Sequence, residues 1–243
     1  MSGGAPRLEA SGLEVAYGKV SVLTGVDFRV EAGEVVALLG TNGAGKSTLL
    51  RTLSGILTPT AGTVTLEGDD ITGRRPSEIV RRGVVQMPGG RATFPGLTVR
   101  ENLVIGGATV EKSARDERVG HVLTRFPFLA ERADQMAGSL SGGQQQMLAL
   151  ARALIARPRV LMIDELSLGL APAIVAELLE IVTSLRDEGV SVVIVDQHVN
   201  LALSFSDRAY FLERGRVRFE GPAAALAGRD DLLRAVFFAG ATA

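Results

Sequence analysis

The chain has 243 residues, 46% of them hydrophobic, which is enough for one large domain or for a core with a subdomain. The lack of cysteine excludes disulfides, thiolate metal sites and cysteine nucleophiles, and the net charge of −1, with no basic run longer than a doublet, weighs against nucleic acid. No apolar run approaches the ~20 residues of a membrane span and the first residues lack the hydrophobic segment of a signal peptide, so we expect a cytoplasmic protein with no nucleic-acid partner.

The first elements in the chain are two predicted strands. Residues 7–16 and 20–30 alternate apolar and polar positions, as strands with one buried face do. Tyr17 lies in the predicted turn between them. Its ring can stack on an adenine base or pack on the core, and this stretch alone favours neither interpretation.

The next stretch contains a phosphate-binding motif. An apolar run at 35–39 predicts a buried strand, and a helix is predicted from Ser47 onward. The glycine-rich turn between them matches G-x-x-x-x-G-K-[ST], the phosphate-binding loop, in the strand–helix context that this motif requires. The predicted nucleotide-binding residues of the loop are Gly40, Thr41, Asn42, Gly43, Ala44, Gly45, Lys46, Ser47 and Thr48.

The residue types of this loop suit nucleotide phosphates. Glycines let successive backbone N–H groups turn inward around an anion, and the start of the following helix adds unpaired N–H groups and a partial positive charge. The Lys46 ammonium can reach the terminal phosphates, and the Ser47 hydroxyl can ligate Mg²⁺. The alternative is an ordinary glycine turn before a helix.

Four elements are predicted between this loop and residue 88. The helix of the loop ends at Gly55, and a strand follows at 63–68. A short helix at 76–82 has proline in its first turn. The last of the four is a strand at 83–87, and Gln86 stands at its end.

Helical patterns dominate from residue 88 to residue 157. A glycine- and proline-rich loop at 88–96 opens this segment. Helices are predicted at 98–105, 114–125 and 141–156. The segment 88–157 is therefore a predicted helical subdomain, inserted between the two parts of a core at 7–87 and 158–243.

Strands and helices alternate again after residue 158. A strand predicted at 159–165 ends in two acids. The later predictions are, in order, a helix at 173–187, a strand at 190–195, a helix at 200–205, a hairpin of strands at 209–212 and 217–220, and a final helix at 230–238. Apolar strands that alternate with helices predict an α/β fold with a mainly parallel core sheet, and the alternating strands at the start predict an antiparallel edge layer.

The two acids complete a predicted hydrolytic site. Hydrolysis at a phosphate-binding loop needs an acid that holds Mg²⁺ and a group that orients the attacking water. The apolar run 161–163 ends in Asp164, which is predicted to hold Mg²⁺ through water, and Glu165 is predicted to polarise the water that attacks the γ-phosphate. Two strand-end acids that cap the next helix are the alternative.

A second anion-binding helix start is predicted near residue 140. A serine followed by two glycines opens a long helix there, although a serine cap is also what an ordinary helix has. The residues are Leu140, Ser141, Gly142, Gly143 and Gln144. One ATP scarcely needs two phosphate sites in a single chain, whereas two chains arranged head to tail would use both.

Taken together, the motifs resemble those of the ATP-binding cassette (ABC) ATPase family, over nearly the full length of the chain. In family order they are Tyr17, the phosphate-binding loop Gly40–Thr48, Gln86, the signature motif Leu140–Gln144 and the Walker B motif Met162–Glu165. The resemblance implies a P-loop NTPase fold that binds ATP and Mg²⁺, with Tyr17 stacked on adenine. It also implies that Gln86 contacts Mg²⁺ and links to the transporter, and that the signature motif contacts the γ-phosphate bound by an opposite subunit.

Three segments look like those of the ATPases of branched-chain amino-acid importers: Gly90–Val99, Gln144–Met147 and Ser167–Pro172. Such importers pair two ATPases beneath two membrane permeases, which a solute-binding protein supplies. The resemblance implies that the partners are permease subunits, a second ABC ATPase in a homo- or heterodimer and, indirectly, an extracytoplasmic solute-binding protein. It places the chain at the cytoplasmic face of the plasma membrane. Importers of urea and short amides use similar ATPases, so the solute stays open.

Three positions depart from the family pattern. Leu166 stands where the family usually has a proline, and Ala171 where it usually has an aspartate that helps the two sites communicate. Counted back from Asp207, the position of the family's switch histidine is Gln197, which can donate a hydrogen bond to phosphate but cannot carry a proton. His198 is the lesser candidate, with a helix-start residue at the surface as its alternative role.

The predicted function is that of an ATP-hydrolysing importer subunit. The three departures suggest a low-turnover ATP sensor as one alternative, and an ABC ATPase outside transport is another. The predicted catalytic residues are Glu165 and Gln197, and the predicted Mg²⁺ ligands are Ser47, Gln86 and Asp164.

Overall fold

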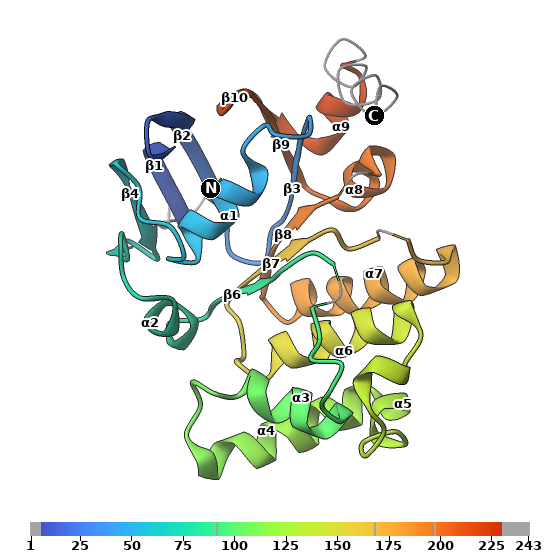
Figure 1. Ribbon diagram of the computed structural model, residues 1–243. Helices are drawn as coiled ribbons and strands as arrows, with labels where there is room; N and C mark the ends of the chain where they lie inside the picture. Colours follow the sequence, from blue (N-terminus) through green and yellow to red (C-terminus); the bar gives the residue numbers. More distant parts are fainter. Residues whose placement is uncertain (1–5, 91, 168, 197, 230–243) are drawn as a thin grey trace.

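The computed structural model describes residues 6–90, 92–167, 169–196 and 198–229. Two β-sheets and a group of helices make up this part of the chain (Figure 1). The predicted final helix at 230–238 and the predicted phosphate contact Gln197 lie outside the described residues.

The larger sheet forms the core and has six strands in the order β10-β9-β3-β8-β7-β6. They are β3 (Val35–Gly40), β6 (Val84–Met87), β7 (Val160–Asp164), β8 (Ser191–Val195), β9 (Arg208–Glu213) and β10 (Arg216–Pro222). Neighbouring strands are parallel except in the β9–β10 hairpin. Strands β3, β7 and β8 are buried almost throughout, as expected when both faces of a parallel sheet are covered. The predicted mainly parallel core sheet is confirmed.

The smaller sheet is antiparallel and has the strand order β2-β1-β4-β5. Its strands are β1 (Leu8–Tyr17), β2 (Val20–Val30), β4 (Ala61–Leu66) and β5 (Asp69–Asp70). Buried and exposed side chains alternate along much of β1 and β2, so the predicted antiparallel layer is confirmed. Tyr17, which the sequence places in a turn, is the last residue of β1 and pairs with Val20.

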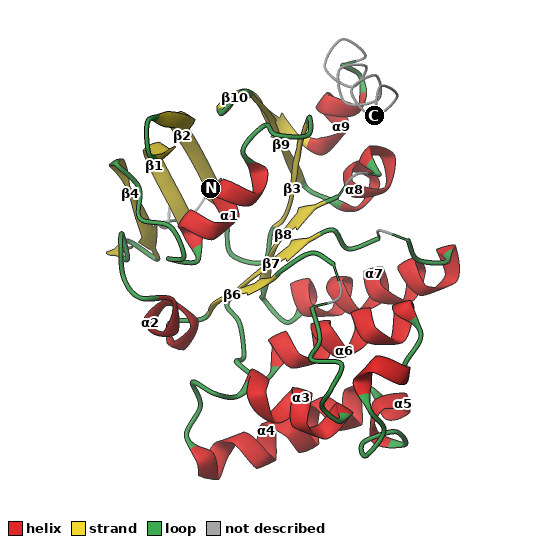
Figure 2. Cartoon of the chain, in the orientation of Figure 1, coloured by secondary structure: helices red, strands yellow, loops and turns green. Residues whose placement is uncertain are grey.

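Helices cover the core sheet and account for the rest of the fold. They are α1 (Lys46–Leu53), α2 (Pro76–Arg81), α3 (Val99–Gly106), α4 (Lys112–Arg125), α5 (Pro127–Ala130), α6 (Gly142–Leu154), α7 (Pro172–Asp187), α8 (Val199–Phe205) and α9 (Ala223–Ala227). Helices α3 to α6 gather on the side of the core sheet away from the antiparallel sheet (Figure 2). Within the described ranges, no helix is long and apolar enough to cross a membrane.

The short elements α5, α9 and β5 do not appear among the predictions. They contain 4, 5 and 2 residues, respectively, which is too little chain for a helical or strand period to be visible. The longer predicted elements between residues 7 and 222 are all present, with ends that differ by one or two residues in most cases.

Alternate side chains of the core strands pack into two different hydrophobic clusters. On β7, Leu161 and Ile163 pack with buried residues of α3, α6 and α7. Val160 and Met162, on the opposite face, pack with α1 and the antiparallel sheet. Because both faces are packed, the register of the sheet is fixed. The carboxyl ends of β3, β7 and β8 therefore lie side by side at one edge of the sheet.

Candidate functional site

A cavity of about 310 Å³ lies at the carboxyl ends of β3, β7 and β8. Residues 42–48 of the phosphate-binding loop line it, together with Asp164 and Glu165 at the end of β7 and Asp196 after β8. In parallel α/β sheets this edge is where ligands bind. The fold therefore brings the phosphate-binding loop and the two acids together, although Ser47 and Asp164 are 117 positions apart.

The phosphate-binding loop has a conformation that needs its glycines. Gly40 has a φ of 150°, and a Cβ there would lie 2.1 Å from the backbone oxygen of Leu212 on β9. Gly45 is the N-cap of α1, has a φ of 105° and would bring a Cβ within 2.6 Å of the Leu23 side chain. Gly45 has no side chain that could cap α1, which leaves the first N–H groups of this helix for an anion.

Lys46 is held inside this loop. Its Nζ donates hydrogen bonds to the backbone oxygens of Gly40, at 2.8 Å, and Thr41, at 2.9 Å. Burial lowers the pKa of the Lys46 ammonium, while the carboxylates of Asp164 and Glu165 oppose that shift. The half-buried Lys46 ammonium is well suited to bind phosphate. A phosphate anion would compensate for the water that this ammonium loses by burial.

Ser47 and Asp164 form the part of the cavity that fits Mg²⁺. The Ser47 hydroxyl donates to Oδ2 of Asp164 at 3.3 Å, so two hard oxygen ligands meet in one place. Among the described residues no cluster of three or more His, Cys, Asp or Glu side chains could hold a metal ion. Phosphate and water oxygens would therefore complete the coordination of Mg²⁺, which commonly keeps several such ligands.

The pKa of Asp164 is raised above its ordinary value. Burial is the largest cause of this shift, and the hydrogen bond from Ser47 opposes it. A carboxyl group whose pKa is raised by folding destabilises the fold once it is ionised, above its ordinary pKa. We expect Asp164→Asn to raise the melting temperature of the nucleotide-free protein at pH 7 by about 1–3 °C. The same change should weaken Mg²⁺-dependent ATP turnover, because a neutral amide is a poorer ligand for Mg²⁺.

Thermal melts between pH 3 and pH 8 check this expectation. The gain should disappear below about pH 4, where Asp164 of the unchanged protein is protonated. Asp134→Asn, which alters an exposed acid outside the cavity, is the matched control. A melting temperature that falls at pH 7 with Asp164→Asn would contradict the account of Asp164.

Glu165 begins the turn after β7 rather than ending the strand as predicted. It has a φ of 56°, unusual for a residue with a side chain, and its backbone N–H donates to the oxygen of Val195 at 2.7 Å. Gly89 lies against it, because a Cβ on Gly89 would be only 2.8 Å from Oε2 of Glu165. Gly89 belongs to none of the sequence motifs, although its place two residues after β6, the neighbour of β7, is a signal for it.

The structure does not bring Gln86 to the cavity. Gln86 lies within β6 and pairs with Met162 of β7, two residues before Asp164. Its Oε1 accepts a hydrogen bond from the Ser54 hydroxyl, at the end of α1, at 2.8 Å. Gln86 does not line the cavity in this conformation, and its contact with Mg²⁺ stays a prediction.

Tyr17 lines the same cavity as the phosphate-binding loop. Its side chain is 45% exposed, so one end of the cavity offers an aromatic surface to a flat base. The position is compatible with the adenine stacking that the sequence resemblance implies.

The signature motif lies outside this cavity, at the start of α6. Ser141 caps the helix: its hydroxyl accepts from the backbone N–H of Gln144, and Gln144 accepts from the N–H of Ser141 in return. Ser141 and Gly142 are exposed, whereas Leu140 is buried. None of these residues lines the cavity of the same chain, and the predicted binding of an anion at this helix start stays a prediction.

His198, the lesser candidate for the phosphate contact, is the N-cap of α8. Its Nδ1 lies 2.7 Å from the Ser167 hydroxyl and 3.3 Å from Oδ1 of Asp196. A carboxylate only accepts, and the single Ser167 proton goes to Asp196 at 2.7 Å, so this network assigns a proton to Nδ1 of His198. The ring is thus engaged with Ser167 and Asp196, and it does not itself line the cavity.

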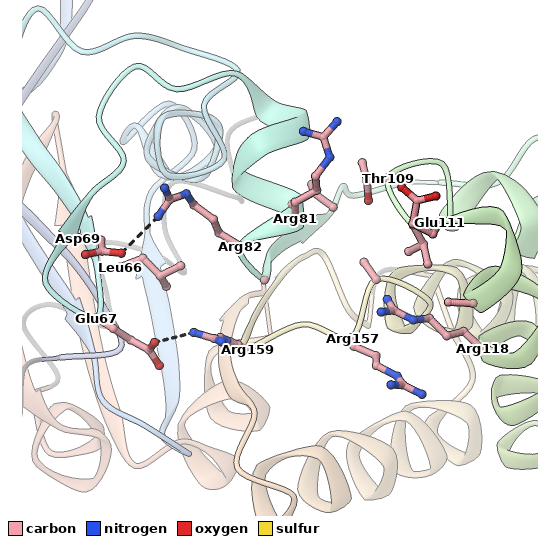
Figure 3. Close-up of a pocket in the computed structure, with 15 residues that line it drawn as sticks. Leu66, Glu67, Asp69, Arg81, Arg82, Thr109, Glu111, Arg118, Arg157 and Arg159 are labelled. Carbon is pink, nitrogen blue, oxygen red and sulfur yellow. Dashed lines mark hydrogen bonds and ion pairs between the residues drawn. The ribbon is translucent and has the colours of Figure 1, made fainter.

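A larger cavity, of about 520 Å³, lies away from these residues (Figure 3). Charged side chains from the antiparallel sheet, α2 and α4 line it, and two of its arginines are paired with acids that also line it. Arg82 contacts Asp69 at 3.3 Å and Arg159 contacts Glu67 at 2.6 Å. None of the predicted site residues faces this cavity, so size alone does not identify the functional site.

Comparisons with known proteins agree with the geometry. Residues 23–167 match the family model described as ABC transporter. The chain is 47% identical to the high-affinity branched-chain amino acid transport ATP-binding protein BraG of Pseudomonas aeruginosa, over 86% of this chain and 90% of that protein. It is 38% identical to the probable branched-chain amino acid transport ATP-binding protein LivF of Archaeoglobus fulgidus, over 87% and 90%.

Solved structures give the same result. An ATP-binding cassette of an ABC transporter in its ADP conformation superposes with a TM-score of 0.87 and 26% identity, over 96% of this chain and 99% of that one. A dimeric bacterial ABC transporter cassette superposes with a TM-score of 0.78 and 25% identity, over 89% and 98%. The chain therefore belongs to the ABC transporter family, as one of its ATP-binding subunits that couple ATP hydrolysis to transport.

Proposed function

We propose that this chain hydrolyses ATP to drive an importer of branched-chain amino acids. The observation that carries the proposal is the meeting of Lys46, Ser47, Asp164 and Glu165 in one cavity, in a chain with 47% identity to a branched-chain amino acid transport ATPase. A second relative with the same kind of name, at 38% identity, supports the same solute class. Urea or a short amide is the alternative solute.

The residues of the cavity divide the chemistry between them. The N–H groups of residues 42–48 and the Lys46 ammonium would bind the phosphates, and Tyr17 would stack on the adenine. Ser47 and Asp164 would hold Mg²⁺, which when bound supplies positive charge against the phosphate oxygens. Glu165 would orient the attacking water and accept its proton, and Gln197 would donate a hydrogen bond to the γ-phosphate.

A second chain would complete each site. The exposed signature residues Ser141 and Gly142 form an anion-binding helix start that faces no nucleotide loop of their own chain. In a head-to-tail pair, each signature motif would reach the γ-phosphate held by the other chain, and closure would exclude water. The dimeric cassette among the similar structures supports a pair of chains, with either a second copy or a related ATPase as the partner.

The assembly would lie at the cytoplasmic face of the plasma membrane. Permease subunits would bind this chain there, with the helical subdomain at 88–157 moving as a unit, and an extracytoplasmic solute-binding protein would deliver the solute to them. Purification of the native membrane complex through a tag on this chain tests the proposal. We expect two permeases and ATPase subunits to copurify, and ATP turnover to rise with a branched-chain amino acid and its binding protein.

Two outcomes of this purification experiment would contradict the proposed function. Copurification with no membrane protein, or turnover that responds to urea or a short amide and not to branched-chain amino acids, would contradict the proposal. The variant Glu165→Gln is the control, because it should assemble with the same subunits and yet not respond to solute.

A further inference from the structure

The turn at residues 165–167 is held by a side chain from the signature helix. The amide nitrogen of Gln146, on α6, lies 3.2 Å from the backbone oxygen of Glu165 and 3.4 Å from that of Leu166. Gln146 is only 8% exposed, so both contacts lie inside the protein. An amide nitrogen has two protons, one for each of these oxygens, and the geometry therefore orients both peptide groups.

Asp196 also holds this turn, through a different residue. Its carboxylate accepts the backbone N–H of Ser167 at 2.9 Å and the Ser167 hydroxyl at 2.7 Å. The N–H of Glu165 donates to Val195 at 2.7 Å, so the end of β8 also holds the turn. The turn that carries the Glu165 carboxylate thus has two sets of contacts, one with α6 and one with the end of β8 and the residue after it.

These hydrogen bonds stabilise a backbone conformation of Glu165 that is unfavourable without them. Glu165 has a φ of 56°, in the left-handed region, which residues with a Cβ seldom adopt. Leu166 does not restrict φ as a proline would. Hydrogen bonds from outside the turn, rather than the chain itself, therefore keep the Glu165 side chain directed into the cavity.

Helix α6 is a rigid connection to the signature motif. Its capped start at Ser141 precedes Gln146 by five residues, a rise of ~7.5 Å along the axis. The residues from Gln145 to Leu150 are all buried, so the helix moves as one body with its packing. We expect a displacement of its exposed start to reach the amide of Gln146.

We propose that Gln146 is a positioning residue that couples the signature end of α6 to Glu165 of the same chain. The inference rests on the proposed function, in which the signature end contacts nucleotide bound by the partner. ATP on the partner fixes α6, Gln146 orients the Glu165 turn, and the Glu165 carboxylate is aligned at the other site. Each site then senses whether the other is occupied, by a route that does not involve Ala171.

Two substitutions of Gln146 in the full-length chain, assembled in its native membrane complex, test the coupling. Gln146→Met keeps the length and burial of the side chain but has no donor, and Gln146→Glu keeps its shape but presents an acceptor to two carbonyl oxygens. We expect kcat at saturating ATP to fall about 10-fold or more in both, since small displacements of a catalytic group are costly. The Kd for a fluorescent ATP analogue should stay within about twofold, because Gln146 does not line the cavity.

The matched control is Gln145→Met on the same helix. Gln145 is 7% exposed and donates to the backbone oxygens of Ala137 and Leu140, so this change also removes two buried hydrogen bonds but leaves the Glu165 turn untouched. We expect it to lower the melting temperature as much as Gln146→Met does, with kcat within about threefold of the unchanged protein. The Hill coefficient for ATP should fall only in the Gln146 variants.

The possible results distinguish a failure of the Gln146 coupling from a failure of the proposed function. If both Gln146 variants fold and keep kcat within twofold, or lose no more kcat than Gln145→Met, then Gln146 only packs the core and the coupling is wrong. If the unchanged complex binds ATP but does not turn it over, the proposed function fails first, and the inference fails with it.

Discussion

Replacement of Glu165 by glutamine should reduce kcat for ATP by about 100-fold or more while ATP affinity stays within about twofold. Glu165 lines the nucleotide cavity at the end of β7, next to Asp164 and opposite the phosphate-binding loop. Glutamine keeps the size of the side chain but cannot accept a proton from water. The loss should therefore appear in kcat, the signature of an interaction made in the transition state.

Single-turnover and steady-state ATP hydrolysis, together with the Kd of a fluorescent ATP analogue, measure this effect. Glu180→Gln, on the exposed side of α7 and outside the cavity, is the matched control and should behave like the unchanged protein. Turnover that is unchanged by Glu165→Gln would remove Glu165 from the mechanism. If turnover is low in both proteins, the low-turnover sensor becomes the better interpretation of Leu166, Ala171 and Gln197.

Replacement of Lys46 by alanine should weaken ATP binding about 10- to 100-fold, the effect of losing a charge-assisted contact worth about 1.5–3 kcal/mol. Two backbone oxygens, of Gly40 and Thr41, hold the ammonium in the loop at 2.8 and 2.9 Å. Arginine should not rescue the site, because a planar guanidinium is too wide for a cradle shaped to a compact ammonium. Isothermal titration with Mg·ATP measures the change.

Lys112→Ala is the control for Lys46→Ala, because Lys112 is exposed at the start of α4 and far from the loop in sequence. The Lys46 variant should also melt no more than a few degrees below the unchanged protein, since its side chain is only half-buried. Normal ATP affinity in a folded Lys46→Ala protein would show that the cavity at 42–48 is not the nucleotide site.

The sequence was most informative where local pattern and local structure coincide. The apolar run at 35–39, the glycine loop and the helix after it form β3, the loop and α1 because each needs only neighbouring residues. The apolar run before Asp164 likewise forms β7, buried on both faces. The Ser141–Gln144 capping box marks the start of α6 within one residue.

The sequence alone could not predict the positions of residues whose role depends on the register of the sheet. Gln86 and Gly89 are three positions apart, and only the pairing of β6 with β7 reveals that Gly89, and not Gln86, lies at the level of Glu165. The contacts of Gln146 and Asp196 with the turn at 165–167 join elements 20 and 29 positions away, so no local pattern predicts them. The left-handed φ of Glu165 is also a tertiary effect, since glutamate has no preference for it.

The measurement closest to the central claim is solute uptake into proteoliposomes that contain the complete membrane complex. Uptake of a branched-chain amino acid should require ATP on the side of this chain, rise with the solute-binding protein, and track the rate of ATP hydrolysis. Glu165→Gln should abolish both uptake and stimulated hydrolysis while the complex stays assembled. Uptake that continues at the normal rate with Glu165→Gln, or hydrolysis that does not respond to the solute, would contradict the account.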